Sequence, residues 1–170
     1  MMIAKEYPNF LQEYEADRVE QILTDPEFPW YLNRILYKVL IAPKTNYQMN
    51  HSFYLHDTYN SPYKELIDIF RYKLNWTTLV KCRANLIFRT DQIIQHGWHS
   101  DFPEKGMHTA LYYVNTNNGY TIFEETKEKH MSVKNKFIEF PTLNSHSGTT
   151  CTDAPYRIVI NFNYYKPSPQ

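Results

Sequence analysis

From residue 79 onward the chain alternates apolar and polar residues, and this alternation is the strongest constraint on its fold. Between 80 and 86 every second residue is apolar, with Lys, Arg and Asn in between. A period of two places successive side chains on opposite faces of a β-strand. Similar segments follow at 109–115, 119–124, 136–140 and 156–165, separated by polar turns and without helical spacing. This part of the chain therefore predicts an antiparallel sandwich or barrel.

The first 78 residues include two segments with helical spacing. The first begins near Asn9, a capping residue, and runs to position 24. The second is introduced by Ser61-Pro62, a cap followed by proline at the first helical position, and its apolar residues predict one buried face. Two helices packed on a mainly β core are therefore expected. Strand-like runs lie between these helices at 35–42 and 47–55.

Composition and charge indicate a single globular domain that is not built to bind a long polyanion. The 170 residues are 42% hydrophobic, and eighteen basic residues balance eighteen acidic ones without a basic run. Nucleic acid is therefore not expected as a partner. The N-terminus lacks a signal-like apolar stretch and no apolar run reaches membrane-spanning length, so we expect a soluble cytoplasmic protein with no membrane segment. Cys82 and Cys151 lack CxxC spacing and are expected to be buried thiols.

His99-Ser100-Asp101 is the first candidate for chemistry. On an extended segment His99 and Asp101 point the same way, because side chains alternate. One such pair is weak evidence, since it is common in solvated loops, but this one lies between a strand-like run and a turn. Two histidines and one carboxylate on one side of an ion leave three coordination positions open, as expected of a non-haem Fe(II) oxygenase. The pair therefore needs a second histidine.

Three histidines downstream are candidates for that ligand. His108 opens the next strand pattern and is too close in sequence to be the far ligand of a sandwich. His130 lies among charged residues, and we expect it to be an exposed loop residue. His146 follows an apolar strand and precedes Ser-Gly, a turn before the last strand. His146 is therefore the preferred ligand.

The last strand-like segment, 156–165, carries Arg157 on its more polar face. One interpretation is a half-buried strand with a solvated polar face. The other is that Arg157 points into a cavity and binds a carboxylate with two parallel hydrogen bonds, a task that suits its planar guanidinium. On this strand alone the two interpretations remain equally open.

Taken together, these segments resemble the Fe(II)/2-oxoglutarate-dependent dioxygenases, particularly their prolyl-hydroxylase-like branch. The order and spacing of the segments are more specific than any one motif. The resemblance implies a double-stranded β-helix (jelly-roll, cupin-like) core over 79–166, with 1–78 as helical and leading-strand support in a single domain, 1–170. The matching pieces are 99–101, 110–115, 118–121, 146–148 and Arg157, eleven positions after His146.

The resemblance also implies a cofactor, a co-substrate and a reaction. The cofactor would be Fe(II), the co-substrate 2-oxoglutarate, and molecular oxygen would be consumed in hydroxylating a C–H bond. His99, Asp101 and His146 would bind the iron. The residues implied for the distal carboxylate of 2-oxoglutarate are Arg157, Tyr113 and, as a weaker candidate, Asn161. No catalytic group beyond the metal ligands is implied.

The substrate is hardly addressed by the sequence. The resemblance makes a protein or peptide side chain the leading expectation, with a small amino-acid-like metabolite close behind. Aromatic residues near the motifs offer a substrate groove, although ordinary core packing is the stronger expectation for each one alone. These residues are Trp98, Phe102 and Tyr112, together with Trp30 and Tyr31 in an earlier connector.

Three alternatives remain. A jelly-roll module that binds a ligand or metal without catalysis would be expected to lack one of the three ligands or the arginine. A zinc hydrolase could use the same ligands, but Arg157 would have no evident role in it. Demethylation of DNA or RNA on this fold calls for a basic groove, which the neutral charge disfavours.

Overall fold

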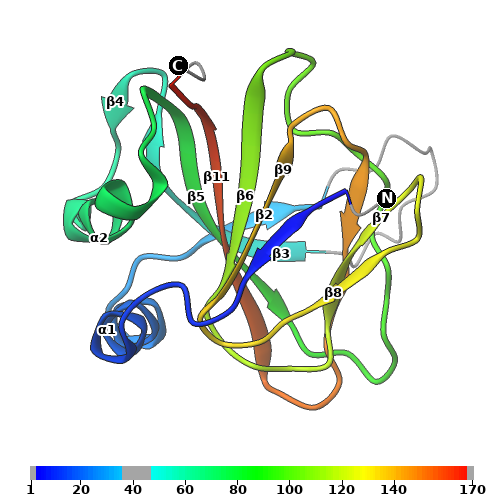
Figure 1. Ribbon diagram of the computed structural model, residues 1–170. Coiled ribbons are helices and arrows are strands. Elements are labelled where there is room, and N and C mark those ends of the chain that lie inside the picture. The colour runs from blue at the N-terminus through cyan, green and yellow to red at the C-terminus, as the bar shows by residue number, and fades with distance from the viewer. Residues whose placement is uncertain (1–2, 36–46, 168–170) are drawn as a thin grey trace.

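The protein folds into two antiparallel sheets and two helices, as seen in a computed structural model that describes residues 3–35 and 47–167 (Figure 1). Both helices lie on one side of the large sheet, and the small sheet lies toward its other side (Figure 1). The expectation of a mainly β protein with N-terminal helices and a jelly-roll core is confirmed. Among the described residues, no helix combines the length and apolarity needed to cross a membrane.

The large sheet has eight strands in the order β1-β9-β6-β11-β5-β3-β2, with β4 paired to β3. All of these pairs are antiparallel, and β11 lies at the centre between β5 and β6. The strands are β1 (Lys5–Tyr7), β2 (Tyr31–Arg34), β3 (Tyr47–Leu55), β4 (Thr58–Tyr59), β5 (Thr78–Phe88), β6 (Met107–Tyr113), β9 (Lys136–Pro141) and β11 (Tyr156–Tyr165).

The small sheet contains β10 (His146–Gly148), β7 (Tyr120–Phe123) and β8 (Lys129–Met131), in that order. Its outer side is extended by two isolated bridges, Gln95↔Thr149 and His99↔His146. The segment around 95–99 therefore pairs with β10 although it is not itself a regular strand. This pairing completes the two-layer jelly roll and brings the His-Ser-Asp segment beside the downstream histidine.

The helices begin later than the sequence suggested. Helix α1 spans Glu13–Thr24 and is capped at Gln12, whose backbone N–H donates to the Glu15 carboxylate at 2.9 Å, so Asn9 is not the cap. Helix α2 spans Lys64–Leu74. The Ser61 hydroxyl accepts from the Tyr63 backbone N–H at 3.1 Å, and this local turn delays the helix past the proline.

The expected strand at 35–42 also differs from the structure. The strand in this region is β2, which ends at Arg34, and the remainder of that prediction from 36 on lies outside the described residues. Strands β3 and β11 have the bounds predicted from the sequence. Cys82 and Cys151 are buried free thiols, as expected.

The alternation along β11 separates the core from the interior of the jelly roll. Ile158, Ile160, Phe162 and Tyr164 face the helices and are almost fully buried. Residues on the opposite face point between the two sheets, where Arg157 and Asn161 line a cavity. Neighbouring β5 and β6 alternate in the same way, so polar residues of three adjacent strands meet inside the jelly roll.

Candidate functional site

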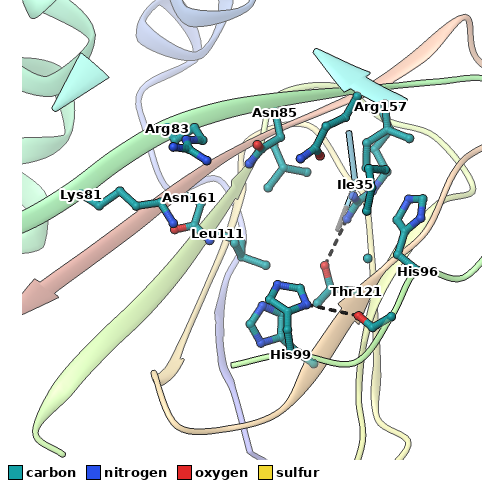
Figure 2. Close-up of a pocket in the computed structure, with 16 residues that line it drawn as sticks. Ile35, Lys81, Arg83, Asn85, His96, His99, Leu111, Thr121, Arg157 and Asn161 are labelled. Carbon is teal, nitrogen blue, oxygen red and sulfur yellow. Dashed lines mark hydrogen bonds between the residues drawn. The ribbon is translucent and has the colours of Figure 1, made fainter. Parts of the chain in front are cut away.

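A cavity of about 390 Å³ lies between the two sheets. The large sheet contributes Lys81, Arg83 and Asn161, and the segment bridged to the small sheet contributes His99 (Figure 2). The small sheet itself contributes His146. The cavity therefore combines groups from most of the chain. The segments 79–88, 95–101, 146–148 and 157–161 meet there because β11 and β5 are paired, and because His99 and His146 are bridged.

His99, Asp101 and His146 form a cluster whose ligand atoms all lie within 4.8 Å of one another. His99 Nε2 is 3.7 Å from Asp101 Oδ1, and the two imidazole rings have centroids 4.5 Å apart. The backbones of the two histidines exchange hydrogen bonds of 3.0 and 2.9 Å, which fixes the two ligands relative to each other. The three residues singled out from the sequence are thus brought together.

Backbone hydrogen bonds orient both imidazoles. His146 Nδ1 lies 3.0 Å from the Asn144 carbonyl, and His99 Nδ1 lies 3.2 Å from the Gly97 carbonyl. A carbonyl only accepts, so the proton resides on Nδ1 in both rings and the Nε2 lone pairs are available. This arrangement is the usual way in which proteins set the tautomer of metal-binding histidines.

Asp101 is held by three side chains at one of its oxygens. Its Oδ2 accepts from Asn161 Nδ2 and Asn163 Nδ2, both at 2.9 Å, and from the Thr109 hydroxyl at 3.2 Å. The other oxygen, Oδ1, faces His99. The carboxylate is therefore oriented by strands β11 and β6, and Oδ1 remains available to bind a metal ion.

The electrostatics of the cluster favour a charged Asp101 and a neutral His146. Burial alone would raise the pKa of Asp101, but the Lys81 ammonium, His146 and the asparagine hydrogen bonds lower it overall. Burial lowers the pKa of His146, against the effect of Asp101. One carboxylate and two imidazoles suit a first-row divalent metal ion.

Arg157 is buried at the other end of the cavity. Its Nε donates to the Ser132 hydroxyl at 2.6 Å and its Nη2 donates to the Thr121 hydroxyl at 3.1 Å. These two bonds fix the plane of the guanidinium and leave further N–H donors. Because Arg157 is 3% exposed and has no carboxylate partner among the described residues, it suits an anionic ligand that enters the cavity.

Gly119 allows the Arg157 side chain to take this position. A Cβ atom at Gly119 would lie 2.7 Å from Arg157 Cδ and 2.8 Å from the Thr150 carbonyl oxygen, which is backbone. Both distances are shorter than real Cβ contacts. Only glycine fits between the turn and the arginine.

We therefore expect Gly119→Ala to lower the free energy of unfolding by about 1–3 kcal/mol, because the added methyl displaces Arg157 or the Thr150 backbone. Gly148→Ala is the matched control, because its Cβ would meet Arg157 Nη1 at 3.5 Å, an ordinary contact. Urea denaturation of both variants checks this. Equal stability of the two variants would contradict the steric role of Gly119.

The other residues proposed for the co-substrate lie in different places. Tyr113 is fully buried behind Arg157, whose Cζ is 5.6 Å from the Tyr113 ring centroid. Burial raises the pKa of Tyr113 to about 12, although Arg157 works in the opposite direction, so the phenol stays protonated, and it donates to the His130 carbonyl at 3.4 Å. Asn161 lies toward the metal cluster, four residues along β11 from Arg157, and its amide donates to Asp101.

The aromatic residues proposed for a substrate groove are mostly not at the cavity. Tyr112 is fully buried in the core against the helices, on the face of β6 opposite Tyr113, so the structure corrects its assignment to a substrate groove. Trp98 is not among the residues that line the cavity. Its ring lies against Lys127 instead, with Lys127 Nζ 4.8 Å from the ring centroid. Phe102 is close to the cavity, because Lys81 Nζ lies 5.6 Å from its ring centroid. Trp30 packs against the core, and Tyr31 is exposed.

The two other downstream histidines are outside the cluster. His108 lies on β6, 3.8 Å from Glu139. His130 was expected in an exposed loop, and this prediction was wrong. It is 3% exposed on β8, with Nδ1 2.6 Å from Glu6 and Nε2 3.0 Å from Glu128. The acidic residues that surround it come from two segments, which local sequence does not reveal.

Several residues at the site were not identified from the sequence. Asn163 and Thr109 hold Asp101, while Ser132 and Thr121 hold Arg157. Asn163 shares a strand face with Arg157 and Asn161, so the alternation of β11 could have placed it in the site. For Ser132 and Thr121 the signal was weak, because short polar residues are common near turns.

The buried side chain of His96 should make the stability of the protein depend on pH. Burial, with smaller effects of Arg157 and His99, lowers the pKa of His96 to about 4. A lowered pKa means that the unfolded chain takes up more protons than the folded one below about pH 6.5. The free energy of unfolding therefore decreases as the pH is lowered through that range. The loss at about pH 5 is about 2 kcal/mol for this residue.

We expect the free energy of unfolding of the metal-free protein to fall between about pH 8 and about pH 5, and to fall less in His96→Asn. The shifts of the other histidines affect both proteins equally, so the difference isolates His96. Urea titrations at the two pH values measure it. The same pH dependence in both proteins would show that the His96 pKa is not lowered.

Comparison with solved structures shows that the chain has the fold of the 2-oxoglutarate/Fe(II) oxygenases. An oxidoreductase of the 2OG-Fe(II) oxygenase family from Burkholderia pseudomallei matches with a TM-score of 0.72 and 12% identity, over 98% of this chain and 86% of that one. No family sequence model and no curated protein sequence matches this chain. The fold is therefore recognised through structure rather than through sequence.

Two further structures illustrate the range of this fold. A prolyl hydroxylase from Trichoplax adhaerens, solved in complex with a hypoxia inducible factor peptide fragment, matches with a TM-score of 0.61 and 15% identity, over 96% of this chain and 84% of that one. An alpha-ketoglutarate-dependent carbocyclase from nogalamycin biosynthesis matches with a TM-score of 0.68 and 10% identity, over 99% and 83%. The same fold thus occurs in a hydroxylase and in a carbocyclase.

Proposed function

We propose that this protein is an Fe(II)- and 2-oxoglutarate-dependent dioxygenase that hydroxylates a C–H bond. The observation that supports this most directly is one cavity lined both by the two histidines of a two-histidine, one-carboxylate cluster and by a buried arginine without a carboxylate partner among the described residues. Each feature alone would also suit a different kind of site. Together they suit one metal ion and one dicarboxylate.

The donor set fits Fe(II). His99 Nε2, His146 Nε2 and one Asp101 oxygen would hold the ion on one side, and both imidazoles already have the required tautomer. When bound, Fe(II) with 2-oxoglutarate and oxygen supplies the oxidising chemistry that hydroxylates a C–H bond and releases succinate and carbon dioxide. Thr109, Asn161 and Asn163 would keep the Asp101 carboxylate oriented during turnover.

Arg157 would bind the distal carboxylate of 2-oxoglutarate. Thr121 and Ser132 fix the guanidinium in advance, so little conformational freedom is lost on binding. The Tyr113 hydroxyl, which now donates to the His130 carbonyl at 3.4 Å, would have to turn from that bond to donate to the carboxylate. A dry environment strengthens these ion pairs and keeps water away from the reacting atoms.

For the substrate we propose a group small enough to enter the cavity, either on a peptide or on a free amino-acid-like molecule. The fold neighbours include a prolyl hydroxylase solved with a peptide and an enzyme of small-molecule biosynthesis. The cavity of about 390 Å³ would hold the co-substrate and one compact group.

An anaerobic titration with Fe(II) and then 2-oxoglutarate tests the proposal. We expect a weak visible charge-transfer band when the keto acid chelates the iron, and we expect it to be lost in His146→Ala. His56→Ala is the control, because His56 is an exposed turn residue outside the site. Absence of the band in the wild type would contradict the proposal and leave a jelly-roll module that binds a metal or ligand without this reaction.

A further inference from the structure

Lys81 and Arg83 lie on the cavity wall beside the metal cluster. Both are on β5, where Lys81 is paired with Asn163 and Arg83 with Asn161, the two asparagines that hold Asp101. Figure 2 shows both side chains on the sheet side of the cavity, across from His99. The two cations therefore lie at the metal end of the cavity, whereas Arg157 is four residues from Asn161 on β11, about 13 Å farther along the sheet by strand rise.

The protein offsets these two charges only in part, because within the described residues the Asp101 carboxylate attracts Lys81. Among the described residues, the Lys81 ammonium and the Arg83 guanidinium form no hydrogen bond or ion pair, and Arg83 Nε is buried without a partner. The segments outside the described ranges contain no Asp or Glu side chain that could pair with them. Asp101 is near Lys81, but its Oδ2 already accepts three hydrogen bonds.

Such an arrangement is unfavourable for the folded state by itself. Residues two apart on one strand face are about 7 Å apart, so the two positive charges repel each other in a partly dry site. Burial and the Arg83 charge lower the pKa of Lys81, while Asp101 raises it. Unpaired cations that destabilise a fold are expected where a ligand supplies the missing charge.

Other polar atoms on the same wall also lack partners. Ser52 and Asn50 on β3 are paired with Arg83 and Asn85, respectively. Within the described residues, Ser52 Oγ, Asn50 Nδ2 and Asn161 Oδ1 are buried with no hydrogen bond. Buried polar atoms in proteins nearly always have partners, so a group of unpaired ones around two cations indicates a site for a polar ligand.

The sum of the charges expected with a metal ion and 2-oxoglutarate bound also indicates that a further anion binds here. A divalent metal ion and Arg157 are together balanced by Asp101 and the two carboxylates of 2-oxoglutarate. The two positive charges of Lys81 and Arg83 then remain. At least one further anion is needed to neutralise them. The co-substrate does not supply it, because its distal carboxylate is taken by Arg157.

We propose that the substrate carries a carboxylate that binds Lys81 and Arg83, so that a free carboxylic acid such as an amino acid is oxidised rather than a neutral prolyl segment of a protein. This inference rests on the proposed function and names its substrate class. The guanidinium donates to the carboxylate and the ammonium pairs with its charge. Ser52 lies beside Arg83 on the neighbouring strand, and Asn50 lies beside Asn85. A carbon next to this carboxylate would lie close to the metal ligands.

Acetate and its neutral analogue acetamide provide a matched pair of probes. The full chain is loaded with Zn(II), which is diamagnetic, and with saturating 2-oxoglutarate, so that the Arg157 end is filled. We expect acetate to shift the backbone amide NMR signals of 81–85 in a saturable way and acetamide to leave them unchanged. Lys81→Met and Arg83→Met should each weaken acetate binding at least about tenfold, whereas Arg71→Met, an exposed position on α2, should not.

Two outcomes would overturn the proposal. One is that acetate binds equally well to Lys81→Met, Arg83→Met and the wild type. The other is that Arg83→Met loses affinity for 2-oxoglutarate, which would assign the cation to the co-substrate. If 2-oxoglutarate does not bind the wild type at all, the proposed function fails, and the acetate shifts at 81–85 still decide whether the anion site exists.

Thermal stability separates a ligand site from a structural role. Arg83 forms no hydrogen bond or ion pair among the described residues and repels Lys81, so replacing it by methionine removes a repulsion and a partly buried charge. Lys81→Met also removes the attraction between Lys81 and Asp101, so Arg83→Met is the variant that separates the two roles. We expect Arg83→Met to melt at or above the wild-type temperature while losing acetate binding. A lower melting temperature in Arg83→Met would show that this cation supports the fold, and would overturn the assignment.

Discussion

Arg157→Met is expected to weaken 2-oxoglutarate binding by about a hundredfold or more while leaving metal binding intact. The substitution keeps most of the apolar stem but removes the charge and every donor of the fork. Thr121 and Ser132 would then lose their partner at the end of the cavity where we propose that the distal carboxylate binds. Anaerobic titration of the Fe(II) protein with 2-oxoglutarate gives the dissociation constant directly.

Two variants make this result specific. Arg157→Lys keeps the charge without the planar fork, so its affinity should fall between the wild type and Arg157→Met. Arg89→Met removes an exposed arginine just beyond β5 and should bind 2-oxoglutarate normally. If Arg157→Met bound the co-substrate like the wild type, the carboxylate would be held elsewhere in the cavity and the role proposed for this arginine would be wrong.

His146→Gln is expected to reduce metal affinity by more than about a hundredfold. His146 is 3% exposed and packs against Phe140, with ring centroids 4.9 Å apart, so glutamine leaves a smaller void than alanine would. The bridge between positions 146 and 99 is made by backbone groups, so the substitution removes the imidazole without breaking it. Equilibrium dialysis against Fe(II) without oxygen, or against Zn(II), measures the affinity.

The melting temperature gives an independent measure of the same metal site. An ion that binds only the folded state raises the melting temperature of the wild type, and the increase should vanish in His146→Gln. His108→Gln is the control, since His108 lies outside the cluster beside Glu139. A metal-induced increase of equal size in His146→Gln would remove this histidine from the ligand set.

The fold class could be predicted from local patterns. Alternation in β5 and β11 determines which residues share a face, and it held along the whole of β11 because both faces of that strand are buried. The order of His99, Asp101, His146 and Arg157 was likewise readable. His146 and Arg157 lie near the starts of β10 and β11, whereas His99 and Asp101 lie in the segment between β5 and β6. Helix starts were less accurate, since Ser61 and Asn9 form local turns rather than caps.

What the sequence by itself determined was therefore the period of each segment and the identity of the metal cluster candidates. Tertiary structure alone decided which face of each strand lies inside the jelly roll. Tyr112 and Tyr113 are neighbours, yet one packs in the core and the other beside Arg157. The burial of His130 and the meeting of Lys81 and Arg83 with the metal cluster depend on pairings between distant strands, which a local pattern does not encode.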